Sequence, residues 1–343
     1  MLAFDVFTDD TFKAVTLNEA LDDLEYIPQA LNRMEIFEPE PITTVGFGVT
    51  RGTEGLELVR TSERGSQPQF IGRDRKNIVQ FETLRLAQES RIKSHEIRDI
   101  VREGMPFDVA LLRAEDEIAK RQEKMMRQLE LTREFHRMAA IQGYVLDVDN
   151  TIIYDLFDAF GYTQPAQILF NFGTLVDGDL IEYLANQIVR PMSRQAGGRW
   201  IEGVTRVGAL CGDQYYDALV KAPDVRETYK TDREYSSLRE MKIWDSLYFG
   251  GIEWMNYRGT NDNSSIKVAS NEVIFFPINA NGVFKEFRSP SEEMDDFEGG
   301  KEFYSFVSPD YRPNIFQWVD IFLYAYPMFM CAAPDTLLRG RLQ

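Results

Sequence analysis

The stretch PFDVALLRAEDEIAKRQEKMMRQLELTREFHRMAAIQ, residues 106–142, decides the predicted fold. It begins with proline, is followed by Gly143 and contains neither residue in between. Proline fits the first turn of a helix and glycine fits its left-handed exit, so one uninterrupted helix is predicted. Apolar residues recur near the 3.6-residue period, which allows one stripe to be buried. They are Leu111, Ala114, Ile118, Met125, Leu129, Ala139 and Ala140.

The charges along this helix indicate a single strut. Acidic residues stand four positions before basic ones in three pairs, each of which stabilises a helix by about 0.3 kcal/mol. The pairs are Asp116–Lys120, Glu117–Arg121 and Glu123–Arg127. A coiled coil is disfavoured because Gln122, Arg133 and His136 interrupt the heptad seam. At 1.5 Å per residue the helix would span roughly 55 Å, which is longer than a compact domain needs.

The composition excludes several classes of function. The formal charge of −17 argues against a nucleic-acid groove. Cys211 and Cys331 are too few for a disulfide framework or a zinc cluster, and His95 and His136 are too few for a multi-histidine metal site. Both histidines are expected on ordinary helix faces or at the surface. The composition therefore predicts no zinc cluster and no multi-histidine metal site; that the chain has no cofactor and no enzyme activity is implied by the family resemblance described below.

No targeting or membrane-spanning segment is predicted. The start, MLAFDVFTDD, lacks the basic and apolar regions of a signal peptide. No run approaches about eighteen apolar residues. A soluble protein of 343 residues, made in the cytosol and large enough for two or three domains, is expected.

A projecting β-hairpin is predicted over residues 43–80. Val45, Phe47 and Val49 alternate with smaller or polar residues, which is the period of a strand. A two-stranded arm is marginally stable alone in water, so a long one implies a partner surface. Residues 60–76 carry five basic and two acidic side chains, which is conspicuous in so acidic a chain. A solvated loop is the alternative interpretation of this tip.

The remaining pattern predicts a mixed set of helices and strands. Helices are expected from Thr16 and over residues 94–103 and 174–190. Strands are expected at residues 144–147, 152–154, 249–257 and 272–277, with a strand–turn–helix at 204–219, a boundary near 193–200 and an acidic surface loop at 292–298. The apolar stretch 316–342 is predicted to be one long strand that completes an inner sheet.

Two acidic motifs suggest a phosphatase as a distant alternative. VLDVDNTI at residues 145–152 is similar to the nucleophile strand of haloacid-dehalogenase phosphatases, in which Asp147 would attack phosphorus and Asp149 would handle the proton. CGDQYYD at residues 211–217 imitates the later metal motif of that family. However, Asp147 follows the long helix after only four residues instead of closing a buried parallel strand. Asp-x-Asp-Asn-Thr is also simply good turn chemistry.

The order of the predicted pieces carries a family resemblance. An arm, a hairpin with a Gly/Arg tip, a long helix, a mixed domain and an apolar ending follow one another. The matching positions are Leu17, Leu21 and 26–28; Leu56, Leu58, Val59 and 64–66; Leu146, Asp147, Asp149 and Thr151; 209–213, Asp217 and Leu219; 249–252, Trp254 and 257–259; and Tyr326, Pro327, Cys331, Pro334 and Leu337. In this the chain resembles the major capsid proteins of tailed bacteriophages, specifically the lambda-type capsid protein E family with the Hong Kong 97 fold. It departs from the family at residues 289–303, where Ser-Pro-Ser-Glu and a longer acidic loop replace Ala-Pro-Ala-Asp.

The resemblance implies an α+β subunit that self-assembles as hexamers and pentamers into an icosahedral head around double-stranded DNA. The implied divisions are an N-terminal arm (1–40), an extended hairpin loop (41–82), a peripheral domain with a spine helix (83–191), an axial domain (192–312) and a returning C-terminal strand (313–343). It also implies a virion protein made in the host bacterial cytoplasm, whose partners are a portal, possible scaffold and decoration proteins, and DNA contacted non-specifically at most, with no membrane. An encapsulin-like compartment, which shares this fold but holds cargo enzyme, is the alternative.

The charge pattern leads to a hypothesis about contacts between subunits. The basic tip is expected to meet acidic residues of a neighbour, while apolar side chains supply most of the adhesion, because rim ion pairs mainly fix the register. The basic residues are Arg60, Arg64, Arg73, Arg75 and Lys76; the acidic ones are Glu292, Glu293, Asp295, Asp296 and Glu298; the apolar ones are Phe47, Leu56, Leu58 and Phe70.

Overall fold

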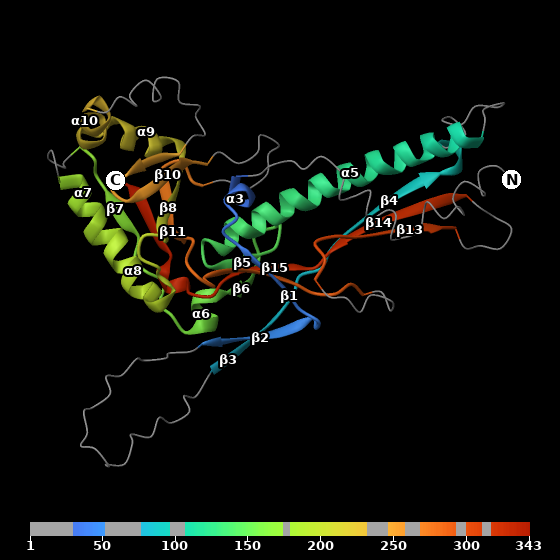
Figure 1. Cartoon of the computed structure of the whole chain (residues 1–343), viewed down its shortest axis with the longest axis horizontal. Helices are drawn as coiled ribbons and strands as arrows, with labels where there is room; N and C mark the ends of the chain where they lie inside the picture. Colours follow the sequence, from blue (N-terminus) through green and yellow to red (C-terminus); the bar gives the residue numbers. More distant parts are fainter. Residues whose placement is uncertain are drawn as a thin grey trace, which may run out of the picture.

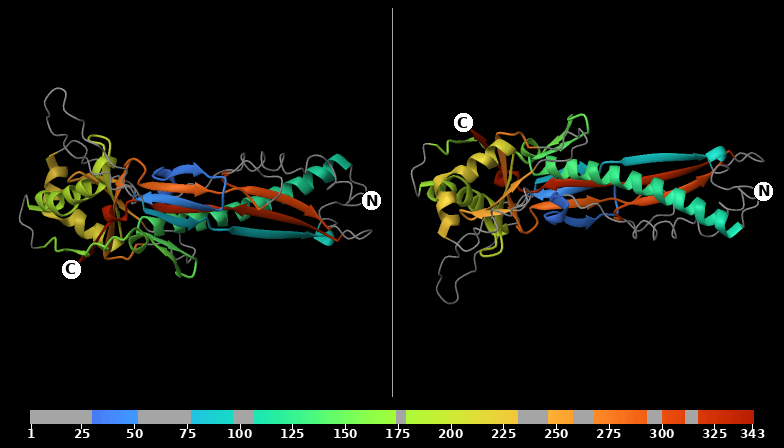
Figure 2. Two further views of the ribbon diagram at one scale, coloured as in Figure 1. Left: turned by 90° about the horizontal axis from the view of Figure 1, so that it is seen from below. Right: turned by 90° about the horizontal axis from the view of Figure 1, so that it is seen from above.

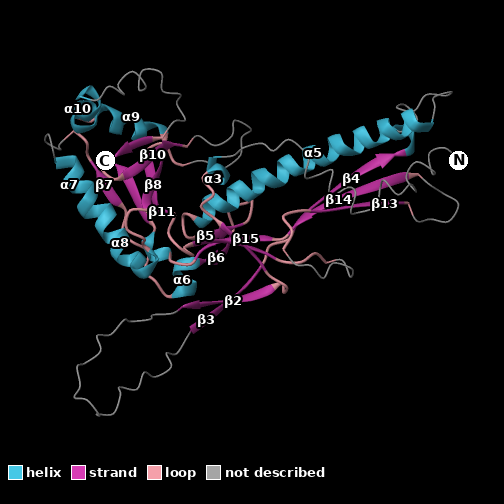
Figure 3. Ribbon diagram, in the orientation of Figure 1, coloured by secondary structure: helices cyan, strands magenta, loops and turns pink. Residues whose placement is uncertain are grey.

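The computed structural model describes residues 30–51, 77–96, 107–173, 179–231, 246–257, 268–292, 300–310 and 317–343. These residues form an elongated molecule with a lobe of helices around a sheet at one end (Figure 1). A long helix and a narrow set of strands extend away from this lobe, and Figure 2 shows that they stay side by side when viewed from below and from above. The helices gather in the lobe and along one side of the extended strands (Figure 3).

The long helix α5, Phe107–Ala140, confirms the prediction made from its proline and glycine boundaries. The ion pairs Glu117–Arg121 and Glu123–Arg127 are both formed along it. Its first part, residues 107–129, buries a stripe that includes Ile118, Met125 and Leu129. In its second part, residues 130–140, every residue from Arg133 onward is buried, because this part of the helix enters the body of the molecule.

This burial corrects one expectation from the sequence. Gln122, Arg133 and His136 were interpreted as interruptions of an apolar seam, yet all three are buried. His136 therefore does not lie on an exposed helix face, whereas His95 is exposed as expected.

A three-stranded antiparallel sheet supports the first part of α5. Its order is β13 (Tyr304–Pro309), β14 (Trp318–Ala325) and β4 (Leu86–Lys93). Alternate residues of β14 are buried, and Val319, Ile321 and Leu323 pack with Met125 and Leu129 of the helix. The period of two along β14 thus meets the stripe of α5 in a small core of its own.

A six-stranded mixed sheet forms the lobe. Its order is β7 (Ile168–Phe170), β16 (Leu338–Leu342), β11 (Glu272–Ile278), β8 (Arg206–Cys211), β10 (Ile252–Asn256) and β9 (Leu247–Phe249). The helical elements of the lobe are α7 (Asp179–Leu184), the π-helical turn Ala185–Val189, α8 (Arg190–Ala196), α9 (Asp213–Lys221) and α10 (Pro223–Thr231). Trp254 lies at the centre of this core, between the rings of Tyr215 and Phe275.

The middle of the molecule joins these two parts. The strands β1 (Glu38–Pro41), β12 (Phe284–Arg288) and β15 (Pro327–Cys331) form a second three-stranded sheet. Two hairpins lie beside it, β2 (Gly46–Arg51) with β3 (Asn77–Glu82) and β5 (Tyr144–Leu146) with β6 (Ile152–Asp155). The short helices α3 (Ala30–Arg33) and α6 (Leu156–Phe160) complete this region.

The C-terminal stretch differs from its prediction as a single strand. It divides into β14, β15 and β16, and each strand belongs to a different sheet. The chain changes sheets at Pro327 and again at the 3₁₀ turn that begins at Pro334. Residues 249–257 are likewise not one strand, because Gly250 and Gly251, both with positive φ, form the turn between β9 and β10.

The packing mixes segments from different parts of the sequence. Phe170, Leu180 and Ile188, in the range 83–191 that was predicted as the peripheral domain, pack in the lobe core. Strands β12 and β13, in the range 192–312 that was predicted as the axial domain, pair with β15 and β14 outside the lobe. The chain thus crosses between the two parts of the molecule more than once.

Candidate inter-subunit site

The root of the predicted hairpin arm is fixed to the body of its own chain. Strands β2 and β3 pair in antiparallel register, with Phe47 opposite Phe81. The Phe47 ring stacks on that of Phe287 at a centroid distance of 4.0 Å, and Phe81 meets the ring of Tyr154 edge-on at 5.3 Å. Phe47, which was expected to contribute to adhesion between subunits, thus packs largely within the chain.

Most of the other predicted contact residues lie outside the described residues. These are Leu56, Leu58, Arg60, Arg64, Phe70, Arg73, Arg75 and Lys76 of the tip, and Glu293, Asp295, Asp296 and Glu298 of the acidic loop. Glu292 is described, and its carboxylate lies 2.9 Å from Nε of Arg85 in the same chain. Both side chains are exposed, so this ion pair contributes at most about 1 kcal/mol and leaves Glu292 accessible to a neighbour.

The structure exposes apolar side chains that were not predicted as contacts between subunits. On the β2–β3 hairpin, Val45 is 59% and Ile78 is 63% exposed. Val148 (63%), Ile152 and Ile153 are exposed on the β5–β6 hairpin. In the sequence, these exposed residues are marked only by the mixing of apolar and polar residues along the hairpins. This pattern does not tell the buried face of a hairpin from the exposed one.

The two aspartates of the phosphatase-like motif form a tight turn. Asp147 and Asp149 connect the antiparallel strands β5 and β6 instead of ending a buried parallel strand. The carboxylate of Asp149 accepts the backbone N–H of Thr151 at 2.9 Å, and hydrogen bonds from Thr151 lower the pKa of Asp149. Asn150 adopts a left-handed conformation with φ of 67°. The aspartates are thus engaged in turn chemistry, which argues against the nucleophile geometry.

Metal and thiol chemistry find no support in the part of the chain that the structure describes. No cluster of three or more His, Cys, Asp or Glu side chains there could hold a metal ion. Cys211 and Cys331 are free and buried, and burial raises the pKa of both thiols, so neither is a ready nucleophile.

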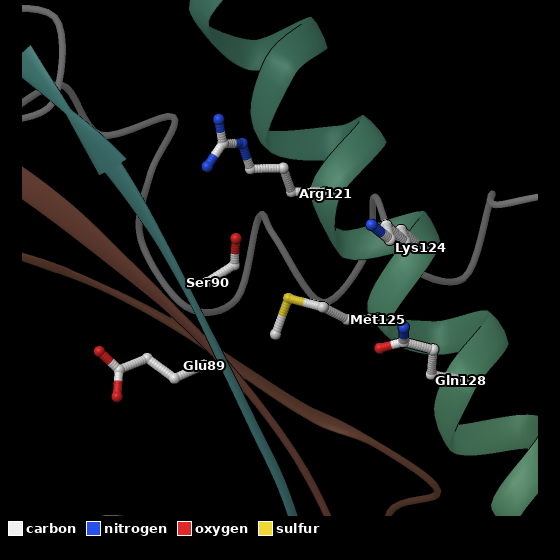
Figure 4. Close-up of a pocket in the computed structure, with 6 residues that line it drawn as sticks. All are labelled: Glu89, Ser90, Arg121, Lys124, Met125 and Gln128. Atoms are coloured by element: carbon white, nitrogen blue, oxygen red, sulfur yellow. The ribbon is translucent and has the colours of Figure 1, made fainter. Parts of the chain in front are cut away.

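A cavity of about 420 Å³ lies between β4 and α5 (Figure 4). It is lined by Glu89, Ser90, Arg121, Lys124, Met125 and Gln128. The guanidinium of Arg121 is already engaged, because it bonds to Glu96 at 2.6 Å, to Glu117 at 3.0 Å and to the carbonyl of Arg91 at 2.8 Å. The arginine therefore braces the helix against the strand and is not available to an anionic ligand.

A buried cluster of charges joins the second part of α5 to the middle sheet. Arg133 lies 2.9 Å from Glu130 and 2.6 Å from Glu286 of β12, and it also pairs with Glu302. Arg288 bonds to both oxygens of the Glu286 carboxylate, at 2.9 Å and 3.0 Å. The cluster is a structural tie between elements that are about 150 residues apart in the sequence.

The pKa shifts within this cluster follow from burial and pairing. Burial raises the pKa of Glu130 and of Glu134 despite the arginines beside them. Burial also acts on Glu286, but Arg133 and then Arg288 hold its pKa below the ordinary value. Burial lowers the pKa of His136 to about 4, so this residue is neutral at pH 7.

No helix among the described residues is long and apolar enough to cross a membrane. The chain resembles known proteins over nearly its full length. The major capsid protein of Salmonella phage Felix O1 is 21% identical over 347 residues, which covers 91% of each chain. The crystal structure of a prophage protein from E. coli CFT073, described as a capsid protein, matches with a TM-score of 0.58 and 13% identity over 96% of this chain and 99% of that one.

The family evidence agrees with this structural likeness. The sequence model of the family described as "Phage major capsid protein E" matches residues 13–342. The match spans the β2–β3 hairpin, α5, the lobe and the three closing strands together. The chain therefore belongs to the phage major capsid protein E family and has the Hong Kong 97-like capsid fold.

Proposed function

We propose that this chain is the repeating subunit of the icosahedral head shell of a tailed phage or prophage, formed from hexamers and pentamers around packaged double-stranded DNA. The observation that carries this proposal is the family match over residues 13–342, which includes the arm, hairpin and long helix as well as the folded lobe. The elongated shape supports it, because thin extensions of this kind bury little surface by themselves (Figure 1).

The proposed division of labour assigns the lobe to the axial domain, where five or six copies gather. The α5 helix with its three-stranded sheet would form the peripheral domain, and the β2–β3 hairpin would reach over the adjacent subunit. The proposed N-terminal arm is residues 1–40, and within it Leu31, Ile36 and Phe37 pack on the body of their own chain.

The proposed contact between subunits retains the charge pattern. The basic tip would set the register against the acidic segment 292–298 of a neighbour, and Leu56, Leu58 and Phe70 would supply apolar contact. The exposed side chains of Val45 and Ile78 support an adhesive role for the hairpin, because both lie outside the chain's own core. A portal, scaffold and decoration proteins are further proposed partners, and synthesis is proposed in the host cytoplasm.

Electron microscopy of the double variant Arg64→Glu/Arg73→Glu, expressed beside the unchanged chain, tests the contact. The variant should stay folded but yield few or no closed shells. The matched control is Arg190→Glu/Arg194→Glu, which changes the net charge equally at two exposed positions of α8. Normal shells from the tip variant, or equal loss in the control, would overturn the assigned role of the tip. Failure of the unchanged chain to form shells with its neighbouring gene products would overturn the proposed function itself.

A further inference from the structure

Three hydrogen-bond donors converge on the carboxylate of Glu134, in the second, buried part of α5. The backbone N–H of Leu31 in α3 donates to Oε1 at 2.8 Å. The hydroxyl of Tyr257, the residue after β10, donates to the same oxygen at 3.3 Å. Nη1 of Arg137, one turn further along α5, lies 3.5 Å from Oε2. The donors come from three elements that are separate in the sequence.

Two of these donors come from parts of the chain that are far from α5 in the sequence. Leu31 is fully buried and lies in α3. Tyr257 is buried too, and its backbone N–H bonds to the carbonyl of Cys211 at 3.0 Å, which ties it to the lobe sheet. A single carboxylate thus connects α3, the long helix and the lobe.

The chemistry of the site makes these bonds interdependent. A buried carboxylate needs its donors, because an acceptor left without a partner bears the full cost of its desolvation. Burial and the charge of Glu134 raise the pKa of Tyr257, so its hydroxyl remains a donor throughout the neutral range. Arg137 is shared with Glu130, whose Oε2 lies 3.7 Å away, so it cannot fully compensate if another donor is lost.

We propose that Glu134 is a three-way latch: its shared hydrogen bonds make the placement of α3 depend on the placement of the lobe. Loss of the Tyr257 bond loosens the hold of Glu134 on Leu31, and release of α3 loosens Tyr257 in turn. The latch is a property of the single chain, so it holds independently of shell formation.

Amide hydrogen exchange of the full chain, unassembled, tests the latch. The Leu31 amide is measured relative to that of Val273 in the centre of the lobe sheet, which removes any change in global stability. Glu134→Ala should speed the relative exchange of Leu31 by about tenfold or more, since a hydrogen bond to a charged group is lost. Tyr257→Phe should speed it by a few-fold, although the removed hydroxyl bonds to Glu134 and not to α3.

The control is Glu286→Gln, a change in the neighbouring buried cluster at a residue whose carboxylate bonds to Arg133 and Arg288. It should leave the relative exchange of Leu31 unchanged. A Tyr257→Phe variant with the exchange pattern of the unchanged chain would overturn the coupling. Equal acceleration in Glu286→Gln would show a general loosening of the buried charges and would overturn the specific role of Glu134.

Discussion

The two parts of α5 belong to one unbroken helix but lie in opposite surroundings. The first part, residues 107–129, buries a single apolar stripe against β14 and leaves pairs such as Glu123–Arg127 at the surface. The second part is enclosed on all sides from Arg133 onward, and Arg133 is paired with carboxylates from both α5 and β12. The same kind of charged pair contributes little to stability in the first part and much in the second, because burial removes the water that would otherwise solvate each charge.

The largest effect is expected from removal of the central charge. Arg133→Met should lower the free energy of unfolding by about 3–5 kcal/mol, because the buried carboxylates of Glu130 and Glu286 would lose the cation that they share. Urea denaturation followed by circular dichroism measures this loss. Adding Glu130→Gln to the variant should restore part of the stability, and a loss below 1 kcal/mol in the single variant would contradict the comparison.

An intermediate, pH-dependent effect is expected at His136. The unfolded chain takes up a proton below the ordinary histidine pKa of 6.5, whereas folded His136 stays neutral down to about 4. Stability should therefore fall as pH drops from 6.5 towards 4, with a contribution that reaches about 3 kcal/mol. Arg133 and Arg137 add to the lowering of its pKa, while Asp147 opposes it.

Thermal unfolding from pH 7 to pH 4.5 measures this contribution. His136→Gln should be less sensitive to acid over this range than the unchanged chain. The control is His95→Gln, at an exposed position, which should retain the full acid sensitivity. Identical pH profiles for the His136→Gln variant and the unchanged chain would show that the histidine is not held neutral by burial.

The smallest effect on stability is expected in the first part of the helix, where the charged pairs are exposed. Arg127→Ala removes the surface pair with Glu123 and should lower stability by about 0.3–0.5 kcal/mol. The same urea titration measures it, and the loss should shrink in high salt because exposed charges are screened. A loss of stability as large as that of Arg133→Met would contradict the distinction between exposed pairs in the first part of α5 and buried pairs in the second.

Much of the fold could be predicted from local patterns. The limits of α5 follow from Pro106 and Gly143, and the strand β2 follows from the alternation of Val45, Phe47 and Val49. The turn at residues 147–151 follows from the tendency of Asp and Asn to bond to their own backbone. The division of residues 316–342 among three sheets could not be predicted, because one apolar alternation suits any strand and does not specify its partner.

The candidate contact site was predictable only in its composition. The basic tip and the acidic loop are features of the sequence, but the stacking of Phe47 on Phe287 depends on the strand β12, which lies far along the chain. The exposed Val148 and Ile152 were missed for the related reason that hydrophobicity alone does not reveal which face of a hairpin is covered.

The sequence by itself determined the long helix, the strand β2 and the turn at residues 147–151, since each depends on residues within a few positions of one another. Only the tertiary structure decided that Arg133 and Glu134 are buried and that α3, β12 and Tyr257 meet them. The physical reason is that a charge can be buried only where partners arrive from elsewhere, and here those partners come from strands and helices more than a hundred residues away.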